Sequence, residues 1–344
     1  MKTNSVKLLL VTGISVFYLL PSAFGQGALT PPGAPAPTMK SLAQIEPRTP
    51  ISSLPFSITQ PGSYYVTTNL YVASGDGISI SAGNVTVDLN GFALTGGGGS
   101  SKGIHFSPSP GVSETNVTVR DGSLSGWGYG VVASTGSHNF VLEHLAVSDC
   151  ANYGIGSPVC PIFARDCISD YNGTYGIYAY NSQITDCDAS NNGSIGIYGI
   201  NCTVRNCSVV NNGSYGIYIF PGTVSDCVVQ SNYFSGIYID APDSEVIGST
   251  CIGNNSCTSP SDAGIYVYDA SNRIENNHVK GSGYAGISVF SHSTYTNNII
   301  VKNTVIGNGA NNYNIPPGQI SGPLITNTVS GVITNSNPWA NFSF

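Results

Sequence analysis

Gly176-Ile177-Tyr178, Gly196-Ile197-Tyr198, Gly216-Ile217-Tyr218 and Gly236-Ile237-Tyr238 recur with a spacing of 20 residues. The same Gly-Ile or Gly-Val signal continues on both sides of these four repeats, at Gly77, Gly103, Gly130, Gly154, Gly264 and Gly286. A fixed period of this size is typical of a solenoid, in which each repeat buries its apolar face against its neighbours. Solenoids lengthen along one axis, so the chain of 344 residues is expected to form one domain.

Each repeat shows three short segments with inward-facing positions. Alternation after Gly216 sends Ile217 and Ile219 to one face and Tyr218 and Phe220 to the other. Two further apolar slots lie 12 and 7 residues before each Gly, occupied by Ile184, Val204, Val224 and Ile274 and by Ala189, Val209, Val229 and Val279. No helical period persists for more than a turn or two, so the pattern predicts an all-β coil with three faces.

The corners between these segments carry repeated polar residues. Four residues before the Gly stand Asn172, Asn192, Asn212 and Asn232. Asn tolerates left-handed or bridging conformations, and each side chain can hydrogen-bond to its equivalent in the next coil. Nine residues before the Gly stand Cys167, Cys187, Cys207 and Cys227, with Asn277 in the same slot of the Gly286 coil. The replacement of Cys by Asn in this slot predicts a tight, inward-facing position at which side chains of successive coils stack.

Residues 1–25 are predicted to be a signal peptide. Lys2 and Lys7 precede an apolar run, Leu8–Leu20, and Ala23-Phe24-Gly25 forms a small-residue cleavage site. The run is about 13 residues long, shorter than the roughly 20 that a membrane-spanning helix needs. We therefore expect a secreted or periplasmic protein without a membrane span.

The remaining sequence divides into three expected parts. Residues 26–50 form a Pro-rich linker in which Met39–Ile45 can form a short cap helix, residues 51–310 form the solenoid, and residues 311–344 form a C-terminal cap or tail. Only 8% of the residues are charged and the net charge is −7. This balance argues against nucleic acid as a partner, because it offers no basic stripe to neutralise phosphates.

The nine cysteines leave two interpretations open. Stacked coils lie about 4.8 Å apart, a separation that a disulfide accepts. Thiols in a row can also pack as small apolar groups, which is the interpretation we favour. Cys251 and Cys257 are the best candidates for a local disulfide. A zinc site is disfavoured, because ligands repeated once per coil form a row rather than a tetrahedron.

Two short blocks of sequence and the repeats carry a family resemblance. Val85–Leu94, Val117–Gly122 and the run of Asn-x-x-x-Gly-Ile units resemble the right-handed parallel β-helix repeat family of the pectin-lyase-like superfamily, over about residues 55 to 310. Ile51–Leu70 resembles the first strand region of exported bacterial members. The resemblance implies a single-stranded right-handed parallel β-helix solenoid of about 10 coils with N- and C-terminal caps. It does not imply an activity, because the superfamily includes lyases, hydrolases, epimerases, tailspikes and adhesins.

The enzymes of this superfamily offer patterns for comparison. The resemblance to pectate lyases would imply an Arg or Lys base with Ca²⁺ on acidic residues, and that to polygalacturonases would imply Gly-His-Gly and Arg-Ile-Lys tripeptides. Neither tripeptide occurs, and no basic residue lies in a matching motif. The catalytic candidates are therefore Asp240, Asp243 and Asp269, which with Asp262 flank a long inter-repeat segment.

A second set of carboxylates precedes the cysteine slot. Asp166, Asp186 and Asp226 stand there, with Asn206 in the gap. Such a row can bind Ca²⁺ or supply an acid and a base, but we favour residues that form turns. No metal or other cofactor is expected apart from Ca²⁺ at such a row.

The outward positions after each Gly are rich in aromatic residues. One column contains Tyr178, Tyr198, Tyr218, Tyr238 and Tyr266, and the next contains Tyr180, Phe220, Tyr268 and Phe290. Rings stack on sugar faces and phenols bond to sugar hydroxyls, although stacked Tyr can also simply stabilise a sheet. The favoured function is noncatalytic binding of polysaccharide or cell-surface glycan through Tyr178, Tyr198, Tyr218, Phe220, Tyr238, Tyr266 and Tyr268. The alternative is a polysaccharide lyase, hydrolase or epimerase with an unfamiliar acidic site.

Overall fold

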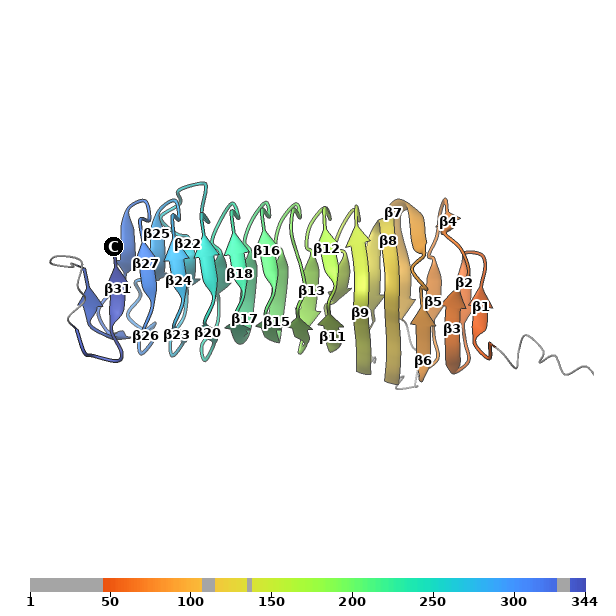
Figure 1. The fold of residues 1–344 in the computed structure, drawn as a ribbon, viewed down its shortest axis with the longest axis horizontal. Coiled ribbons are helices and arrows are strands. Elements are labelled where there is room, and N and C mark those ends of the chain that lie inside the picture. The colour runs from red at the N-terminus through yellow and green to blue at the C-terminus, as the bar shows by residue number, and fades with distance from the viewer. Residues whose placement is uncertain (1–45, 107–114, 135–137, 327–334) are drawn as a thin grey trace, which may run out of the picture. The chain divides into compact units, whose positions relative to one another are not determined.

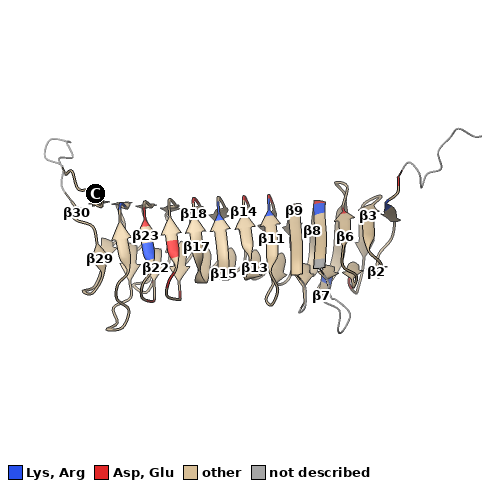
Figure 2. Cartoon of the chain, turned by 90° about the horizontal axis from the view of Figure 1, so that it is seen from below, with Lys and Arg blue, Asp and Glu red and all other residues tan. Residues whose placement is uncertain are grey.

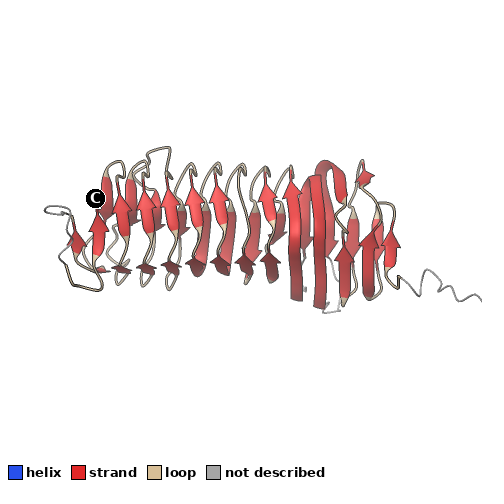
Figure 3. Cartoon of the chain, in the orientation of Figure 1, coloured by secondary structure: helices blue, strands red, loops and turns tan. Residues whose placement is uncertain are grey.

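The computed structural model describes residues 46–106, 115–134, 138–326 and 335–344. The expected signal peptide, the cap helix at Met39–Ile45 and most of the linker lie outside these residues. The described chain contains strands and turns but no helix (Figure 3). It winds as a right-handed parallel β-helix of about 12 turns, slightly more than the 10 or so expected (Figure 1). In the described residues, no helix is long and apolar enough to cross a membrane.

Three parallel faces run along the solenoid. The first, called the tyrosine face, contains β2 (Phe56–Ile58), β5 (Ile78–Ile80), β10 (Ile155–Ser157), β13 (Ile177–Tyr180), β19 (Ile237–Ile239), β22 (Ala263–Val267), β25 (Ala285–Val289) and β28 (Asn311–Asn314). The second, called the charged face, contains β1 (Thr49–Ile51), β3 (Gly62–Val66), β6 (Val85–Asp88), β11 (Ile162–Arg165), β14 (Gln183–Thr185), β20 (Glu245–Ile247), β23 (Arg273–Glu275), β26 (Ile299–Val301) and β29 (Ile320–Ser321).

The third face closes the triangle. It contains β4 (Leu70–Val72), β12 (Ile168–Asp170), β16 (Ser208–Val210), β18 (Val228–Gln230), β21 (Thr250–Ile252), β24 (His278–Lys280), β27 (Thr304–Ile306), β31 (Asn341–Ser343) and β30 (Leu324–Ile325). Five long strands bend through corners and serve more than one face: β7 (Ala93–Phe106), β8 (Thr115–Ala133), β9 (His138–Ser148), β15 (Ile197–Arg205) and β17 (Ile217–Ser225). The strands from β28 to β31 lie in the segment expected as a C-terminal cap or tail.

Pairing in register makes the core a set of apolar columns. Ile177 pairs with Ile197, Ile197 with Ile217, and Ile217 with Ile237, all of them fully buried. The two inward slots predicted on the other faces are likewise 0% exposed at Ile184, Val204, Val224, Ile274, Ala189, Val209, Val229 and Val279. The three-slot prediction is therefore confirmed, and burial of these columns is what holds successive coils together.

The predicted asparagine ladder is confirmed, with a correction to its backbone. In Asn212, Oδ1 accepts from both the backbone N–H and the side chain of Asn192, and Nδ2 donates to Ala189 and to Asn232. The left-handed conformation belongs to the preceding residue, Asn211 at φ 58°, and to its equivalents Tyr171, Asn191 and Ser231. The turn is made by that exposed residue, because the next side chain must point inward to cap buried backbone groups.

The cysteine slot is buried, as predicted, and its thiols are free. The Sγ atoms of Cys187, Cys207 and Cys227 each donate to the backbone carbonyl two residues earlier, at 3.2 Å. The disulfide expected between Cys251 and Cys257 is wrong, since both are free thiols. Cys251 instead occupies an inward core position on the third face, paired with Val229 and Val279.

Candidate functional site

The aromatic residues of the tyrosine face form two adjacent columns. Tyr178, Tyr198, Tyr218, Tyr238 and Tyr266 pair in register along the first column. Tyr180, Ile200 and Phe220 pair along the second. Asp240 follows Ile239, which pairs with Ile219 and Val267, so Asp240 lies in the second column between Phe220 and Tyr268. We call the two columns together the aromatic strip.

Ring packing along the first column follows the coil spacing. The Tyr198 and Tyr218 centroids lie 5.1 Å apart, those of Tyr218 and Tyr238 lie 5.0 Å apart, and those of Tyr238 and Tyr266 lie 5.2 Å apart. These three pairs are stacked, with interplanar angles of 17°, 14° and 15°. Tyr178 meets Tyr198 edge to face. The column is thus a continuous series of ring contacts, stacked from Tyr198 to Tyr266, whose spacing is set by the backbone.

A third set of rings borders the strip and was missed from the sequence. Tyr175 contacts Tyr178 and Tyr198, and Tyr215 contacts Tyr218 and Tyr238. Tyr175 and Tyr215 stand directly before their repeat Gly, with Ile195 and Ser235 at the equivalent positions. The 20-residue period could therefore have revealed this position.

Exposure differs along the strip. Phe220 is 46% exposed, whereas Tyr178, Tyr198, Tyr218 and Tyr238 are half-buried against neighbouring rings. Tyr266 is only 3% exposed, so its expected exposure was wrong. It packs with Ala263 and Ala285, and the partly buried rings of Tyr238, Tyr268, Tyr284 and Phe290 pack against this group. The accessible part of the strip extends from Tyr178 to Tyr238 in the first column and includes Phe220 and Tyr268 in the second.

One carboxylate interrupts the aromatic rings. The Tyr218 hydroxyl donates a hydrogen bond to Oδ2 of Asp240. Burial, followed by this hydrogen bond and by the Asp240 charge, raises the pKa of Tyr218. Burial, with Asp262 and Asp240 nearby, raises the pKa of Tyr215 to about 12. At neutral pH these phenols are protonated and act as hydrogen-bond donors.

Asp262 lies on the other side of the same group of rings. It is buried, and its Oδ1 accepts from the Ser235 hydroxyl at 2.8 Å. Burial raises the pKa of Asp262. The carboxylate also contributes to the raised pKa of Tyr266, after burial of that phenol. Asp262 thus joins the loop after β21 to the tyrosine face.

The structure does not unite the three predicted catalytic carboxylates. Asp243 is an exposed corner residue with a left-handed φ of 58°. Asp269 accepts from the backbone N–H of Ala270 in its own turn. Asp269 and Asp240 both lie near the ring of Tyr295. Burial is the largest cause that raises the pKa of Tyr295, followed by Tyr268 and by these two carboxylates. Only Asp240 lies within the aromatic strip.

The other predicted row of carboxylates lies on a different corner and forms turns. Asp166, Asp186, Asn206 and Asp226 all have left-handed φ values, between 52° and 56°. Each accepts this conformation because Asn and Asp tolerate it better than other residues with a Cβ. The favoured interpretation as turn formers is therefore confirmed.

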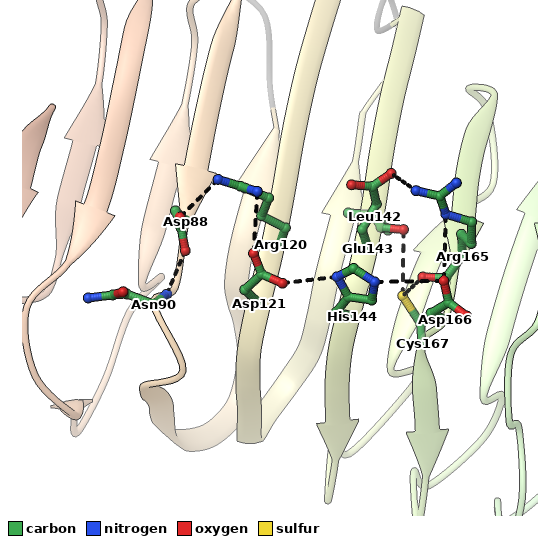
Figure 4. Close-up of polar contacts among 10 residues, drawn as sticks. All are labelled: Asp88, Asn90, Arg120, Asp121, Leu142, Glu143, His144, Arg165, Asp166 and Cys167. Carbon is green, nitrogen blue, oxygen red and sulfur yellow. Dashed lines mark hydrogen bonds and ion pairs between the residues drawn. The ribbon is translucent and has the colours of Figure 1, made fainter.

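Ion pairs extend this row toward the N-terminus. His144 lies between two carboxylates, with Nδ1 at 2.9 Å from Asp121 and Nε2 at 3.7 Å from Asp166 (Figure 4). Arg165 bridges Glu143 and Asp166, and Arg120 bridges Asp88 and Asp121. A shallow hollow of about 420 Å³ lies beside Glu143, Arg165, Asp186 and Arg205. Among the described residues, no group of three or more His, Cys, Asp or Glu is arranged to hold a metal ion.

Basic side chains are absent from the tyrosine-face segments of the strands that carry the described aromatic strip. Charged residues gather along the side of the solenoid that carries β8, β11, β15 and β23 (Figure 2). In the described part of the chain, the tyrosine-face strands β10, β13, β19, β22 and β25 contain no Lys or Arg, and Arg205 and Arg273 lie in charged-face pairings. The aromatic strip is therefore bordered by carboxylates without basic partners, except for His292 beside Phe290.

Comparisons with known proteins agree on the fold. A family model described as right handed beta helix region matches residues 102–251. The A-modules of two mannuronan C-5 epimerases of Azotobacter vinelandii, AlgE6 and AlgE4, superpose with TM-scores of 0.57 and 0.55. Each is 17% identical to this chain, with 76% of this chain and 91% of that module covered.

A tailspike protein named Dettilon is also similar, with a TM-score of 0.51 and 11% identity over 86% of this chain and 60% of that one. No curated protein sequence matches this chain. The fold that the sequence resemblance implied is thus confirmed, and identities this low extend to the fold alone.

Proposed function

We propose that this protein binds polysaccharide, without cleaving it, along the aromatic strip. The main support for this proposal is an uninterrupted series of ring contacts on one face of the solenoid. It runs from Tyr178 through Tyr198, Tyr218 and Tyr238 to Tyr268. Sugar rings offer apolar faces that stack on such a surface, and their hydroxyls accept from protonated phenols. A repeat of about 5 Å also places several contacts within the length of one oligosaccharide.

Two further features support binding as the role of this face. Phe220 exposes 46% of its surface in the middle of the strip, so a ligand that stacks on the neighbouring rings can also reach it. The fold neighbours include two proteins named as mannuronan C-5 epimerases, and these names support a polysaccharide as the ligand class. Export is proposed on the sequence of residues 1–25 and would place the protein where glycans are present.

The test is gel electrophoresis in soluble polysaccharides, comparing the wild-type protein with Phe220→Ser. This variant removes an exposed ring and is expected to lose most of the retardation while melting at the wild-type temperature. Tyr71, which is 65% exposed on β4 of the third face, supplies the matched control Tyr71→Ser. Equal retardation of wild type and Phe220→Ser across neutral, anionic and cationic polymers would contradict the proposal.

A second candidate is a polysaccharide-modifying enzyme. The observation that favours it is the Tyr218–Asp240 hydrogen bond, which joins a protonated phenol to a carboxylate on the same face. Such a pair can donate and accept a proton during lyase, epimerase or hydrolase chemistry. Incubation with the same polymers followed by measurement of new reducing or unsaturated ends distinguishes the two. Product formation that Asp240→Asn abolishes would favour the enzyme over the binding protein.

A further inference from the structure

We propose that Asp240 binds the ammonium group of an amino-sugar unit, so that the ligand of the aromatic strip is a cationic glycan. The inference rests on the proposed binding function and specifies its ligand class. It is carried by the position of one carboxylate among aromatic rings and by the charges around it.

Asp240 is a partly exposed carboxylate surrounded by rings. It lies between Phe220 and Tyr268 in the second column, and Tyr218 donates to its Oδ2. Among the described residues, no group hydrogen-bonds to its other oxygen, Oδ1. A carboxylate oxygen accepts up to two hydrogen bonds, so Oδ1 is available to a ligand donor.

Aromatic rings around this carboxylate favour a cationic donor. Tyr238 and Tyr268 lie 6.2 Å apart between centroids, and Tyr268 and Tyr295 lie 5.5 Å apart. The face of an aromatic ring attracts an ammonium group through its quadrupole, and a nearby carboxylate adds a charge-assisted hydrogen bond. An ammonium group at Oδ1 would gain from the faces of these rings while its sugar ring lies along Phe220.

The wider charge distribution points in the same direction. Asp262 and Asp269 border the same rings, and no described Lys or Arg lies on β19, β22 or β25 to neutralise them. The Asp240 charge reaches Tyr198, Tyr215 and Tyr238, where it adds to burial in raising each phenol pKa. A carboxylated sugar would be repelled here, a neutral sugar would gain only stacking and hydrogen bonds, and an amino sugar would gain an ion pair as well.

The test compares three oligosaccharides of equal length by isothermal titration calorimetry at pH 5.5. They are an oligomer of glucosamine, its fully N-acetylated form and an oligomer of galacturonic acid. The glucosamine oligomer is expected to bind about tenfold more tightly than the N-acetylated one, the size of one charge-assisted hydrogen bond. Galacturonate is expected to bind most weakly. Added salt should weaken glucosamine binding and leave binding of the N-acetylated oligomer unchanged.

Asp240→Asn isolates the carboxylate, because an amide oxygen can still accept from Tyr218. This variant should bind the glucosamine and N-acetylglucosamine oligomers with equal affinity, because its affinity for the glucosamine oligomer alone should fall about tenfold. Asp243→Asn is the matched control: it removes the same charge from an exposed corner whose left-handed φ of 58° Asn accepts.

Three outcomes decide the inference. Equal wild-type affinity for the charged and N-acetylated oligomers would overturn the cationic ligand and leave the binding strip intact. An equal loss in Asp240→Asn and Asp243→Asn would assign the preference to net charge and would also overturn the role of Asp240. No binding of any oligomer or polymer, with Phe220→Ser indistinguishable from wild type, would overturn the proposed function itself.

Discussion

At the residue scale, the solenoid depends on a two-residue device at its corners. An exposed residue adopts the left-handed conformation, and the next residue points inward to cap buried backbone groups, as Asn211 and Asn212 show. The same pair recurs at the other corners, for example Asn276 with Asn277 and Ser271 with Asn272. Asparagine suits both positions because it tolerates positive φ and has both a donor and an acceptor.

The inward residue is expected to contribute most of the corner's stability. Asn212→Ala leaves the buried N–H of Asn192 and the carbonyl of Ala189 without their partner and should lower the free energy of unfolding by about 3 kcal/mol. The exposed neighbour gives a control, because Asn211→Gly preserves the left-handed turn and should change stability by less than about 0.5 kcal/mol. Denaturant unfolding measures both variants, and equal effects would contradict the division of roles.

At the element scale, the repeat Gly of the tyrosine face has no room for a Cβ, as Gly216 shows. A Cβ at Gly216 would lie 2.5 Å from Val229 Cγ1 and 2.6 Å from both Asn232 Nδ2 and the Gly236 carbonyl oxygen. These distances are shorter than real Cβ contacts, and two of the three atoms are held in the core or backbone. The Gly of the repeat is therefore fixed by packing rather than by a left-handed φ.

Gly216→Ala is expected to destabilise the protein by about 3 kcal/mol, as overpacking of a dense interior does. Gly307 offers the opposite case, because it has a φ of 58° and open space where a Cβ would lie. It occupies the corner position that Asn211 fills in an earlier coil, so Gly307→Asn should be tolerated. Thermal unfolding compares the two, and a tolerated Gly216→Ala would show that neighbouring coils can separate to accommodate it.

At the scale of the whole molecule, the solenoid is held together by columns rather than by crosslinks. All nine cysteines are free, and eight of them are buried. Burial raises the pKa of the Cys150 thiol to about 12 and that of Cys251 as well, which makes both poor nucleophiles. The cysteines thus act as small apolar residues along the corners and faces.

Thiol chemistry checks this arrangement. In the folded protein, a thiol reagent should react at Cys257 alone, the one cysteine of intermediate exposure, and in denaturant it should react with all nine. Reductant should leave the melting temperature unchanged, because no disulfide is present to be reduced. A lower melting temperature in reductant, or fewer than nine reactive thiols in denaturant, would contradict a core of free cysteines.

The sequence alone determined the features that repeat along the chain. A 20-residue period specifies one coil, so the inward columns at Ile217, Val204 and Val209 and the ladder at Asn212 could be predicted from it. The outward columns of the aromatic strip followed from the alternation after each Gly. These predictions succeeded because neighbours in a solenoid are equivalent residues one period apart, which makes tertiary contact a local property of the sequence.

Only the tertiary structure decided the features that depend on how different coils and loops meet. The burial of Tyr266 and the bond between Tyr218 and Asp240 break the period. Only the structure showed that Asp240 lies in the aromatic strip, Asp243 at a corner and Asp269 in a turn. A repeat predicts which residues stack. The exposure and pairing of a side chain depend on distances in space, and these cannot be predicted where the spacing between repeat glycines varies from 20 to 28 residues.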